Sequence, residues 1–273
     1  MTNVLVLGAT GTVGRRVVRQ LRERGATVTV ASRAPADRGA VRFDWTDPGT
    51  WEKAVGGATH AFVMAPDGVA VDPRFLHLAT THGVDRMVLL SSKAIEAMGD
   101  LRLLAAERAV HDCGAVWSIV RADWFNQNFD EGFLRDTVLA GEVVMPLGDV
   151  RQAFNDAEDV AAVAVTALTE PGHEGRTYEL SGPEALSFTE AVDIIAENTG
   201  RPLRYLGAAE DYVRVLTECG ADRDQVLAEA AAFAALRAAG DAHVDDTVER
   251  VTGRPPRDFR TYAHEAAARG AWR

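Results

Sequence analysis

The sequence predicts an α/β protein in which a doubly wound parallel sheet is followed by a smaller, mostly helical C-terminal lobe. Through the first half of the chain, short apolar runs alternate with amphipathic stretches, as parallel strands and their crossover helices require. A glycine-rich turn directly follows the first apolar run. After about residue 140, strand signals become sparse and alanine-rich helical stretches dominate. These three observations favour a sheet domain joined to a helical lobe.

Six apolar runs of strand length are expected to form the sheet. They are Asn3–Leu7, Thr27–Ala31, Val41–Phe43, His60–Ala65, Arg86–Leu90 and Val116–Val120. Between the first two, apolar residues recur every four positions from Val13 to Leu21, which places them on one face of a helix that Gly25 is expected to end. Asp47 and Asp72 each precede a proline, a pairing typical of helix starts, so each marks a crossover helix.

The second half carries its own helix signals. Asp156 precedes an expected helix over Ala161–Leu168, and Ser187 has capping-box spacing with Glu190 ahead of a helix over Ala191–Asn198. Further helices are expected over residues 208–219, 222–239 and 259–269. We assign residues 1–145 to the sheet domain and residues 146–273 to the helical lobe, with the chain partly interleaved. The lobe is expected to wall a substrate pocket at the carboxyl edge of the sheet.

Composition excludes several classes of protein. A net charge of −11 repels a phosphate backbone and argues against general nucleic-acid binding. Apolar runs such as Ala161–Val165 are far shorter than the roughly 18 residues that cross a bilayer, and the start lacks signal-peptide features, so a cytoplasmic location and no membrane partner are expected. The two cysteines are isolated, so neither a metal site nor a disulfide is indicated.

The most informative segment is the turn that carries Gly8, Gly11 and Gly14 between the first strand and the first helix. Such a turn needs positive φ, close approach of a ligand to the backbone, and tight helix–strand contact, and glycine meets each need. The helix start adds free N–H groups and a positive dipole end. This is the Rossmann dinucleotide-binding pattern, with a merely structural turn as the alternative. The residues expected to hold the pyrophosphate are Gly8, Thr10, Gly11, Thr12, Val13 and Gly14.

The choice of coenzyme is expected to be made at the end of the second strand, where the chain reads Ala31-Ser32-Arg33. No carboxylate stands there to bind a ribose 2′-hydroxyl, whereas the Arg33 guanidinium and the Ser32 hydroxyl suit a 2′-phosphate. NADP(H) is therefore favoured, and Arg33 as a solvated loop charge is the alternative. Asp44, after the third strand, is expected either to accept from the adenine amino group or to cap a turn ahead of Trp45.

These residues resemble the NmrA-like branch of the atypical short-chain dehydrogenase/reductases, in which a Gly-x-x-Gly-x-x-Gly turn follows the first strand. The resemblance spans nearly the whole chain, and the tail over residues 251–259 is similar to that of a bacterial group related to the ergot-alkaloid reductases. The motifs that carry it are the glycine turn, Ala61–Pro66, Val88–Ser92, Glu107 seven residues before Gly114, Ser118–Asn128 and Tyr178–Gly182.

The resemblance implies a coenzyme that lies across the strand ends. Met64, Ala65 and Pro66 would lie near its ribose, and Trp124 and Phe125 near the nicotinamide. A core aromatic pair in the seam between the domains is the alternative for the last two residues. Ser91 would contact coenzyme or substrate, unless it is a polar strand end satisfied by its own backbone.

The chain departs from the family at the catalytic pair. Carbonyl reductases of this type carry Tyr-x-x-x-Lys after the fifth strand, but the corresponding positions here are Gly99 and Leu103. The usual proton donor to a carbonyl oxygen is therefore missing, which argues against ordinary ketone reduction. Hydride transfer to an iminium carbon needs no proton at the acceptor atom, and quinones and similar conjugated acceptors can take theirs from water. A small, flat, apolar substrate of one of these kinds is expected.

Two side chains are candidates for catalysis at such a site. Lys93 could polarise an electron-rich acceptor or bind the nicotinamide ribose, with a surface lysine as the alternative. Asp123 could stabilise a cationic substrate, or be a structural hydrogen-bonding acid. Glu107 and His111, one helical turn apart, are interpreted as a solvated face. The competing function is a non-catalytic NADP(H) sensor that binds a regulatory partner, and a homodimer through exposed helices is a further expectation.

Overall fold

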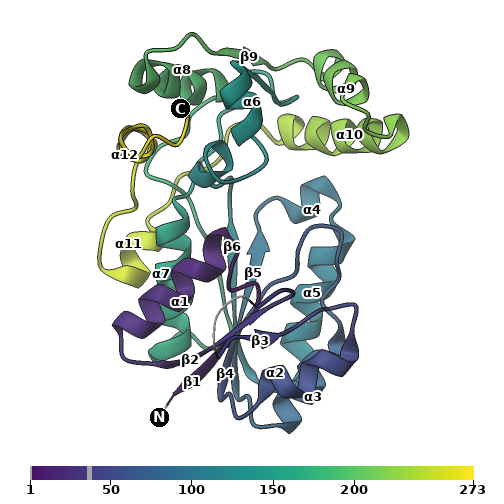
Figure 1. Cartoon of the computed structure of the whole chain (residues 1–273), viewed down its shortest axis with the longest axis vertical. Helices are drawn as coiled ribbons and strands as arrows, with labels where there is room; N and C mark the ends of the chain where they lie inside the picture. Colours follow the sequence, from purple (N-terminus) through teal and green to yellow (C-terminus); the bar gives the residue numbers. More distant parts are fainter. Residues whose placement is uncertain (1, 36–38) are drawn as a thin grey trace.

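A seven-stranded parallel sheet forms the base of the molecule in the computed structural model, which describes residues 2–35 and 39–273 (Figure 1). The strand order is β3-β2-β1-β4-β5-β6-β8, so the chain winds outward from the centre in both directions and the predicted doubly wound sheet is confirmed. The strands are β1 (Asn3–Val6), β2 (Thr27–Ser32), β3 (Val41–Arg42), β4 (His60–Val63), β5 (Arg86–Ser92), β6 (Val116–Ala122) and β8 (Arg176–Glu179).

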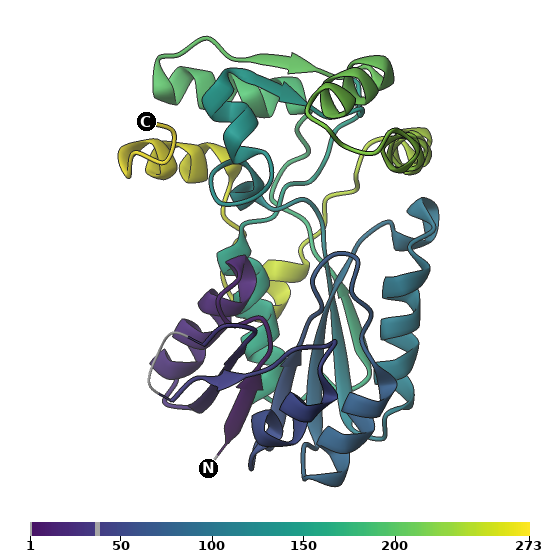
Figure 2. The same ribbon diagram turned by 45° about the vertical axis from the view of Figure 1, so that its right-hand side comes forward.

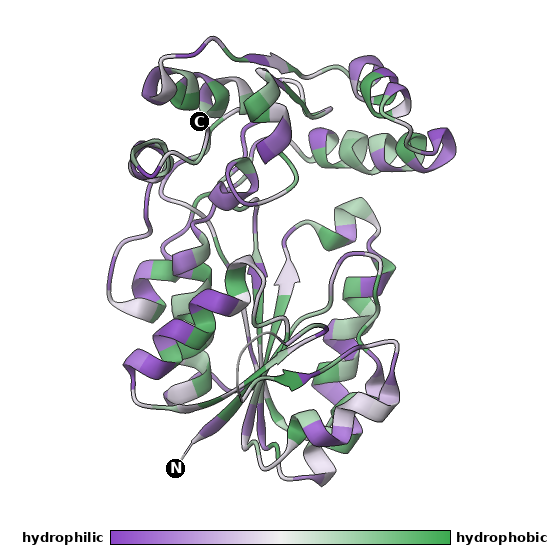
Figure 3. Cartoon of the chain, viewed as in Figure 1, coloured by the Kyte–Doolittle hydropathy of each residue, from purple (hydrophilic) through white to green (hydrophobic). Residues whose placement is uncertain are grey.

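Helices cover both faces of this sheet because its strands are apolar on both sides. In β1, Val4 and Val6 pack toward one set of helices, whereas Leu5, and Leu7 just after the strand, pack toward the other. The first set is α1 (Thr12–Glu23), α7 (Ala157–Thr169) and α11 (Thr247–Thr252), and the second is α2 (Trp51–Val55), α3 (Pro73–Thr81) and α5 (Leu101–Asp112). Figure 3 shows polar and apolar residues mixed along α1, as expected of a helix with one buried face.

The predicted start signals act as expected. The Asp72 carboxylate accepts from the backbone N–H of Arg74 at 2.8 Å and begins α3. Ser187 and Glu190 form both bonds of a capping box at the start of α8 (Phe188–Thr199). Asp47 caps a short 3-10 turn, η1 (Pro48–Thr50), which leads directly into α2.

A second lobe lies beyond the carboxyl ends of the strands, as the turned view in Figure 2 makes clear. Its core of buried aliphatic and aromatic side chains includes Phe129, Phe154, Phe188 and Trp272. Its elements are η2 (Asn126–Phe129), α6 (Arg135–Ala140), β7 (Glu142–Val144), α8, β9 (Arg204–Leu206), α9 (Ala209–Glu218), α10 (Arg223–Ala239) and α12 (Phe259–Ala268), with α4 (Ile95–Met98) of the sheet domain packed against α10.

The chain passes between the two lobes several times. It enters the second lobe with η2, α6 and β7, returns with α7 and β8 to the sheet, and returns again with α11, which packs on α7. The boundary at residue 145 stays a prediction. In the described part of the chain, no helix is both long and apolar enough to cross a bilayer.

The sheet has one strand more than the six that were predicted, and β7 and β9 form a small sheet of their own. The missed strand, β8, is an edge strand whose residues are mostly exposed, so it lacks the apolar run that marked the others. Both β7 and β9 are three residues long, which is too short to show a period.

Candidate active site

The glycine turn is built around two close backbone approaches. Gly8 has φ +62°, and a Cβ there would lie 2.3 Å from the Met64 sulfur. A Cβ on Gly14 would lie 2.1 Å from the carbonyl oxygen of Gly8, so α1 can pack this closely against the turn only with glycine at that position. The N–H of Gly11 donates to the same Gly8 carbonyl at 2.9 Å and closes the turn.

The first turn of α1 is open to a ligand. Gly11 is its N-cap, and in the described part of the chain no side chain caps this end. The N–H groups at the start of a twelve-residue helix therefore face outward with the positive end of its dipole, which suits a pyrophosphate. Thr10 is exposed and Thr12 half-buried, whereas the Val13 side chain is buried in the core, so Val13 offers only its backbone.

Ser32 and Arg33 differ in how they are held. The Ser32 hydroxyl lies buried at the end of β2 without a hydrogen-bond partner. Leaving such a group unpaired costs free energy that an acceptor oxygen would recover, so its position fits a 2′-phosphate. Arg33 is exposed, and among the described residues no carboxylate pairs with it. Both observations agree with a site for NADP(H) at this strand end.

Asp44 caps its own loop. One carboxylate oxygen accepts from both the N–H and the hydroxyl of Thr46, at 2.9 and 2.8 Å, and these bonds hold the pKa of Asp44 below its usual range. The predicted turn is therefore present. The second oxygen lies 4.0 Å from the Arg42 guanidinium, and a contact with adenine stays a prediction. The indole N–H of Trp45 donates to the Met64 carbonyl at 3.0 Å and fixes the end of β4. Sequence reasoning missed this role of Trp45, for which a lone aromatic residue in a loop gives no signal.

Ser91 is part of a buried ion-pair network. Its hydroxyl donates to Glu107 at 2.6 Å, and Glu107 pairs with Arg121 at 2.6 Å. Arg121 also reaches Glu96 at the start of α4. The interpretation of Glu107 and His111 as a solvated face is therefore wrong for Glu107, because this side chain is buried. The positive charge of Arg121 compensates the cost of burying its carboxylate. The Ser91 hydroxyl is engaged inside the protein, and a contact between this residue and the coenzyme stays a prediction.

Lys93 begins a strained turn between β5 and α4. Its N–H donates to the Ala122 carbonyl at 2.9 Å, which ties the end of β5 to that of β6. Ala94, which follows, has φ +56° and is the one non-glycine residue with positive φ in the described chain. A left-handed alanine costs about 1 kcal/mol and persists only where its surroundings enforce it. Here Ala94 packs against the core of the second lobe.

Asp123 stands at the end of β6, near the charge of Lys93. Burial raises the pKa of Asp123 to about 6, and the positive charge of Lys93 opposes this shift in part. One carboxylate oxygen accepts from the N–H of Trp124 at 2.8 Å, and the Asp123 N–H donates to the Asn155 side chain at 2.7 Å. Asp123 thus makes the hydrogen bonds expected of a structural acid, which was the alternative to a catalytic role, and its carboxyl group has a pKa of about 6.

Asp123→Asn is expected to raise the free energy of unfolding at pH 7.5 by about 2 kcal/mol. The folded pKa lies above the unfolded value, so the wild type loses stability as pH rises from about 4 to about 6, whereas asparagine has no charge to bury. Urea denaturation of both proteins at pH 4, 5.5 and 7.5 measures the difference, which should vanish at the lowest pH. Asp44→Asn is the control of opposite sign, because the pKa of Asp44 is lowered.

Trp124 and Phe125 lie on opposite sides of the seam. Trp124 packs with the core of the second lobe, and its indole N–H donates to Gln152 at 3.1 Å. Phe125 packs with the α1 and α7 side of the sheet. Both side chains are half-buried. They pack in the seam as the alternative of a core aromatic pair predicts, and part of each ring is still accessible. Met64, Ala65 and Pro66 are likewise half-buried after β4.

The structure brings the predicted residues into one row. Arg33, Gly8, Met64, Lys93 and Asp123 follow the carboxyl ends of β2, β1, β4, β5 and β6, which are successive neighbours in the sheet. Four steps of about 4.8 Å separate the first strand from the last, a span of about 19 Å. The row crosses the topological switch point between β1 and β4, where ligands of open α/β sheets bind.

The four tyrosines of the chain make their hydrogen bonds elsewhere. Their partners are His173 for Tyr178, Met145 for Tyr205, Glu229 for Tyr212 and Asp130 for Tyr262. Gly99, which occupies the expected tyrosine position, ends α4 in a left-handed conformation. The arrangement therefore offers Asp123 and Lys93 as the ionisable groups at the acceptor end of the row.

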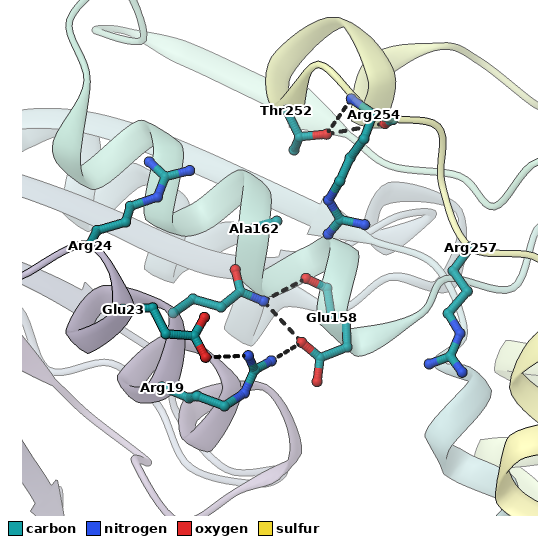
Figure 4. Close-up of a pocket in the computed structure, with 9 residues that line it drawn as sticks. Arg19, Glu23, Arg24, Glu158, Ala162, Thr252, Arg254 and Arg257 are labelled. Atoms are coloured by element: carbon teal, nitrogen blue, oxygen red, sulfur yellow. Dashed lines mark hydrogen bonds and ion pairs between the residues drawn. The ribbon is translucent and has the colours of Figure 1, made fainter.

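A separate pocket of about 490 Å³ lies between α1, α7 and the segment after α11 (Figure 4). Its arginines are already paired: Arg19 with Glu23 at 2.8 Å, and Arg254 with the buried Asp159 at 2.9 Å. Arg257 reaches the buried Asp156. The pairs of Arg254 and Arg257 hold the C-terminal segment against α7, which gives the tail over residues 251–259 a structural role. Because these arginines are paired within the protein, the pocket is a poor candidate for a charged ligand.

The parallel sheet, the glycine turn and the open helix N terminus together define a Rossmann-type nucleotide-binding fold. The chain belongs to the NmrA-like family, whose model matches residues 1–259, so the predicted resemblance is confirmed.

Several relatives resemble the chain over nearly its whole length. It is 34% identical to the NAD(P)H azoreductase of Xenophilus azovorans, covering 98% of this chain and 99% of the relative. It is 28% identical to festuclavine synthase I of Penicillium roqueforti, over 96% and 98%. The fold matches the crystal structure of an NADPH-dependent quinone oxidoreductase from Escherichia coli with a TM-score of 0.78 at 20% identity, over 97% of this chain and 99% of the other.

Proposed function

We propose that this protein is an NADPH-dependent oxidoreductase that delivers hydride to a small conjugated acceptor of the quinone, azo or iminium type. The observation that carries the proposal is the row of strand ends, because it runs from the exposed Arg33 guanidinium at one end to a carboxyl group and an ammonium group at the other. Two of the relatives, an NAD(P)H azoreductase and a festuclavine synthase, support the reaction class.

The residues present fit the coenzyme at three points. The Gly8–Gly14 turn would hold the pyrophosphate on the free N–H groups of α1, and Ser32 with Arg33 would hold the 2′-phosphate. Trp124 and Phe125 would flank the nicotinamide. When bound, NADPH supplies a hydride equivalent, and the protein supplies binding, orientation and electrostatics.

At the acceptor end, the two ionisable side chains have separate roles. The Lys93 ammonium stabilises negative charge that develops on a quinone oxygen or azo nitrogen after the hydride arrives. Neutral Asp123, present below its pKa of about 6, donates the proton that completes this two-electron reduction. Ionised Asp123, above that pH, favours a cationic acceptor, whose charge the hydride neutralises without a proton. Each acceptor class therefore has its own pH dependence.

The test measures NADPH oxidation by purified protein with a quinone, an azo dye and a cyclic iminium salt across pH 5 to 8. Turnover of the quinone or azo dye should fall as pH rises through about 6, and Asp123→Asn should remove this dependence while lowering the rate at pH 5 about tenfold or more. A protein that binds NADPH but oxidises it with no acceptor is the NADP(H) sensor. The homodimer and the cytoplasmic location stay predictions.

A further inference from the structure

The second lobe exposes one aromatic ring beside the acceptor end of the row. Phe133 is 62% exposed, and it is the one aromatic residue among the large apolar side chains that the described chain leaves exposed. Its ring lies 6.2 Å from that of Trp124, at an interplanar angle of 49°. Leaving a phenylalanine in water forgoes roughly 2 kcal/mol of burial, so its position invites a ligand.

Trp124 is held rigidly by its other neighbours. Its ring stacks on Phe233 of α10 at 6.0 Å and meets Phe188 edge-on at 5.2 Å. The bond from its indole N–H to the buried Gln152 fixes the rotation of the ring. Its neighbours therefore fix the Trp124 ring in place, and Phe133 lies against it as a further aromatic neighbour.

The backbone around Phe133 is held as well. The N–H of Gly132 donates to the Gln127 carbonyl at 2.9 Å, and the buried Leu134 donates to that of Asn128 at 3.0 Å. A Cβ on Gly132 would lie 2.9 Å from the Asn128 Cα, so the turn packs closely. Phe133 is thus an exposed ring on an anchored backbone, which is the arrangement of a binding surface with little conformational entropy to lose.

We propose that Phe133 and Trp124 form an aromatic wall that selects acceptors with two or more conjugated rings. The inference rests on the proposed function and deepens it. The proposed function places Asp123 beside the acceptor, and Trp124 is the next residue along the chain, so the wall lies next to the acceptor end of the row. One ring of the acceptor covers the Trp124 edge of the wall, and a second ring reaches Phe133. Aromatic contacts of this kind contribute about 0.5–1.5 kcal/mol beyond the buried area.

The test compares the wild type with Phe133→Ala and Phe133→Tyr. The matched control is Leu101→Ala, which removes an exposed apolar side chain from the start of α5 in the sheet domain. The ratio of kcat/KM for a two-ring azo dye to that for one-ring benzoquinone should fall about tenfold in Phe133→Ala, through KM for the dye. It should recover in Phe133→Tyr and stay unchanged in Leu101→Ala. An unchanged ratio in Phe133→Ala overturns the inference.

A binding measurement separates this inference from the proposed function. The azo dye is titrated into the complex with NADP+, with tryptophan fluorescence as the readout. A Kd about tenfold weaker in Phe133→Ala supports the aromatic wall even if no acceptor is turned over, whereas equal affinity, or no binding to the wild type, overturns it. Sedimentation of both proteins tests whether a second copy of this chain, and not an acceptor, covers Phe133. If the wild type is a dimer and Phe133→Ala is a monomer, Phe133 belongs to a dimer interface and the inference is overturned.

Discussion

Gly14→Ala is expected to abolish measurable coenzyme binding and to lower the free energy of unfolding by at least about 3 kcal/mol. The added Cβ would lie 2.1 Å from the carbonyl oxygen of Gly8 and 2.8 Å from its carbonyl carbon, and both are backbone atoms with no side chain to yield. Helix α1 must then move away from the glycine turn, and the free N–H groups at its start move with it. Calorimetric titration with NADPH and urea denaturation measure the two effects.

Gly11→Ala is the matched control for this substitution. Its φ of −77° suits any residue, and its Cβ would meet only the Gly8 carbonyl oxygen, at 3.3 Å. We expect stability within about 1 kcal/mol of the wild type but weaker NADPH binding, because the methyl group would stand where pyrophosphate approaches the backbone. If Gly14→Ala folds and binds as the wild type does, the turn is not the close-packed cradle described above.

Arg33→Ala is expected to raise the KM for NADPH about 30-fold or more while changing the KM for NADH less than about twofold. A charge-assisted bond to a phosphate contributes about 2 kcal/mol, and NADH has no 2′-phosphate to bind. In the described structure Arg33 has no carboxylate partner, so its loss leaves no buried charge unpaired. Steady-state kinetics with both coenzymes at low ionic strength measure the split.

Arg135→Ala serves as the control, because it removes another exposed arginine, from α6 in the second lobe. It should leave the preference for NADPH over NADH unchanged. Equal losses with the two coenzymes in Arg33→Ala would assign Arg33 to the solvated loop and remove the argument for a 2′-phosphate site.

The parts of the fold that the sequence predicts are those with local signals. Capping residues such as Asp72 and Ser187 contact N–H groups two or three residues away, so a short stretch of sequence contains the whole interaction. The glycine turn is predictable for the same reason. The edge strand β8 is not, because its residues are exposed and it is a strand only through its pairing with β6.

The site divides in the same way. The positions of Gly8, Lys93 and Asp123 follow from strand ends, which the apolar runs reveal. Their surroundings come from residues far away in sequence: Arg121 neutralises Glu107, and Asn155 accepts from Asp123. No periodicity predicts a contact of this kind. Phe133 was missed because an exposed aromatic residue in a loop differs from any other loop residue only once its neighbours are in place.

The late pairing of β8 with β6 bears on how the protein is made. Residues 126–144 must leave for the second lobe and α7 must return before Arg176–Glu179 can dock. Until the ribosome has released that stretch, nascent β6 offers an unpaired edge to other growing chains. Protein that ends before residue 176 is therefore expected to aggregate on expression, and a pause in translation ahead of this point would prolong the need for a chaperone.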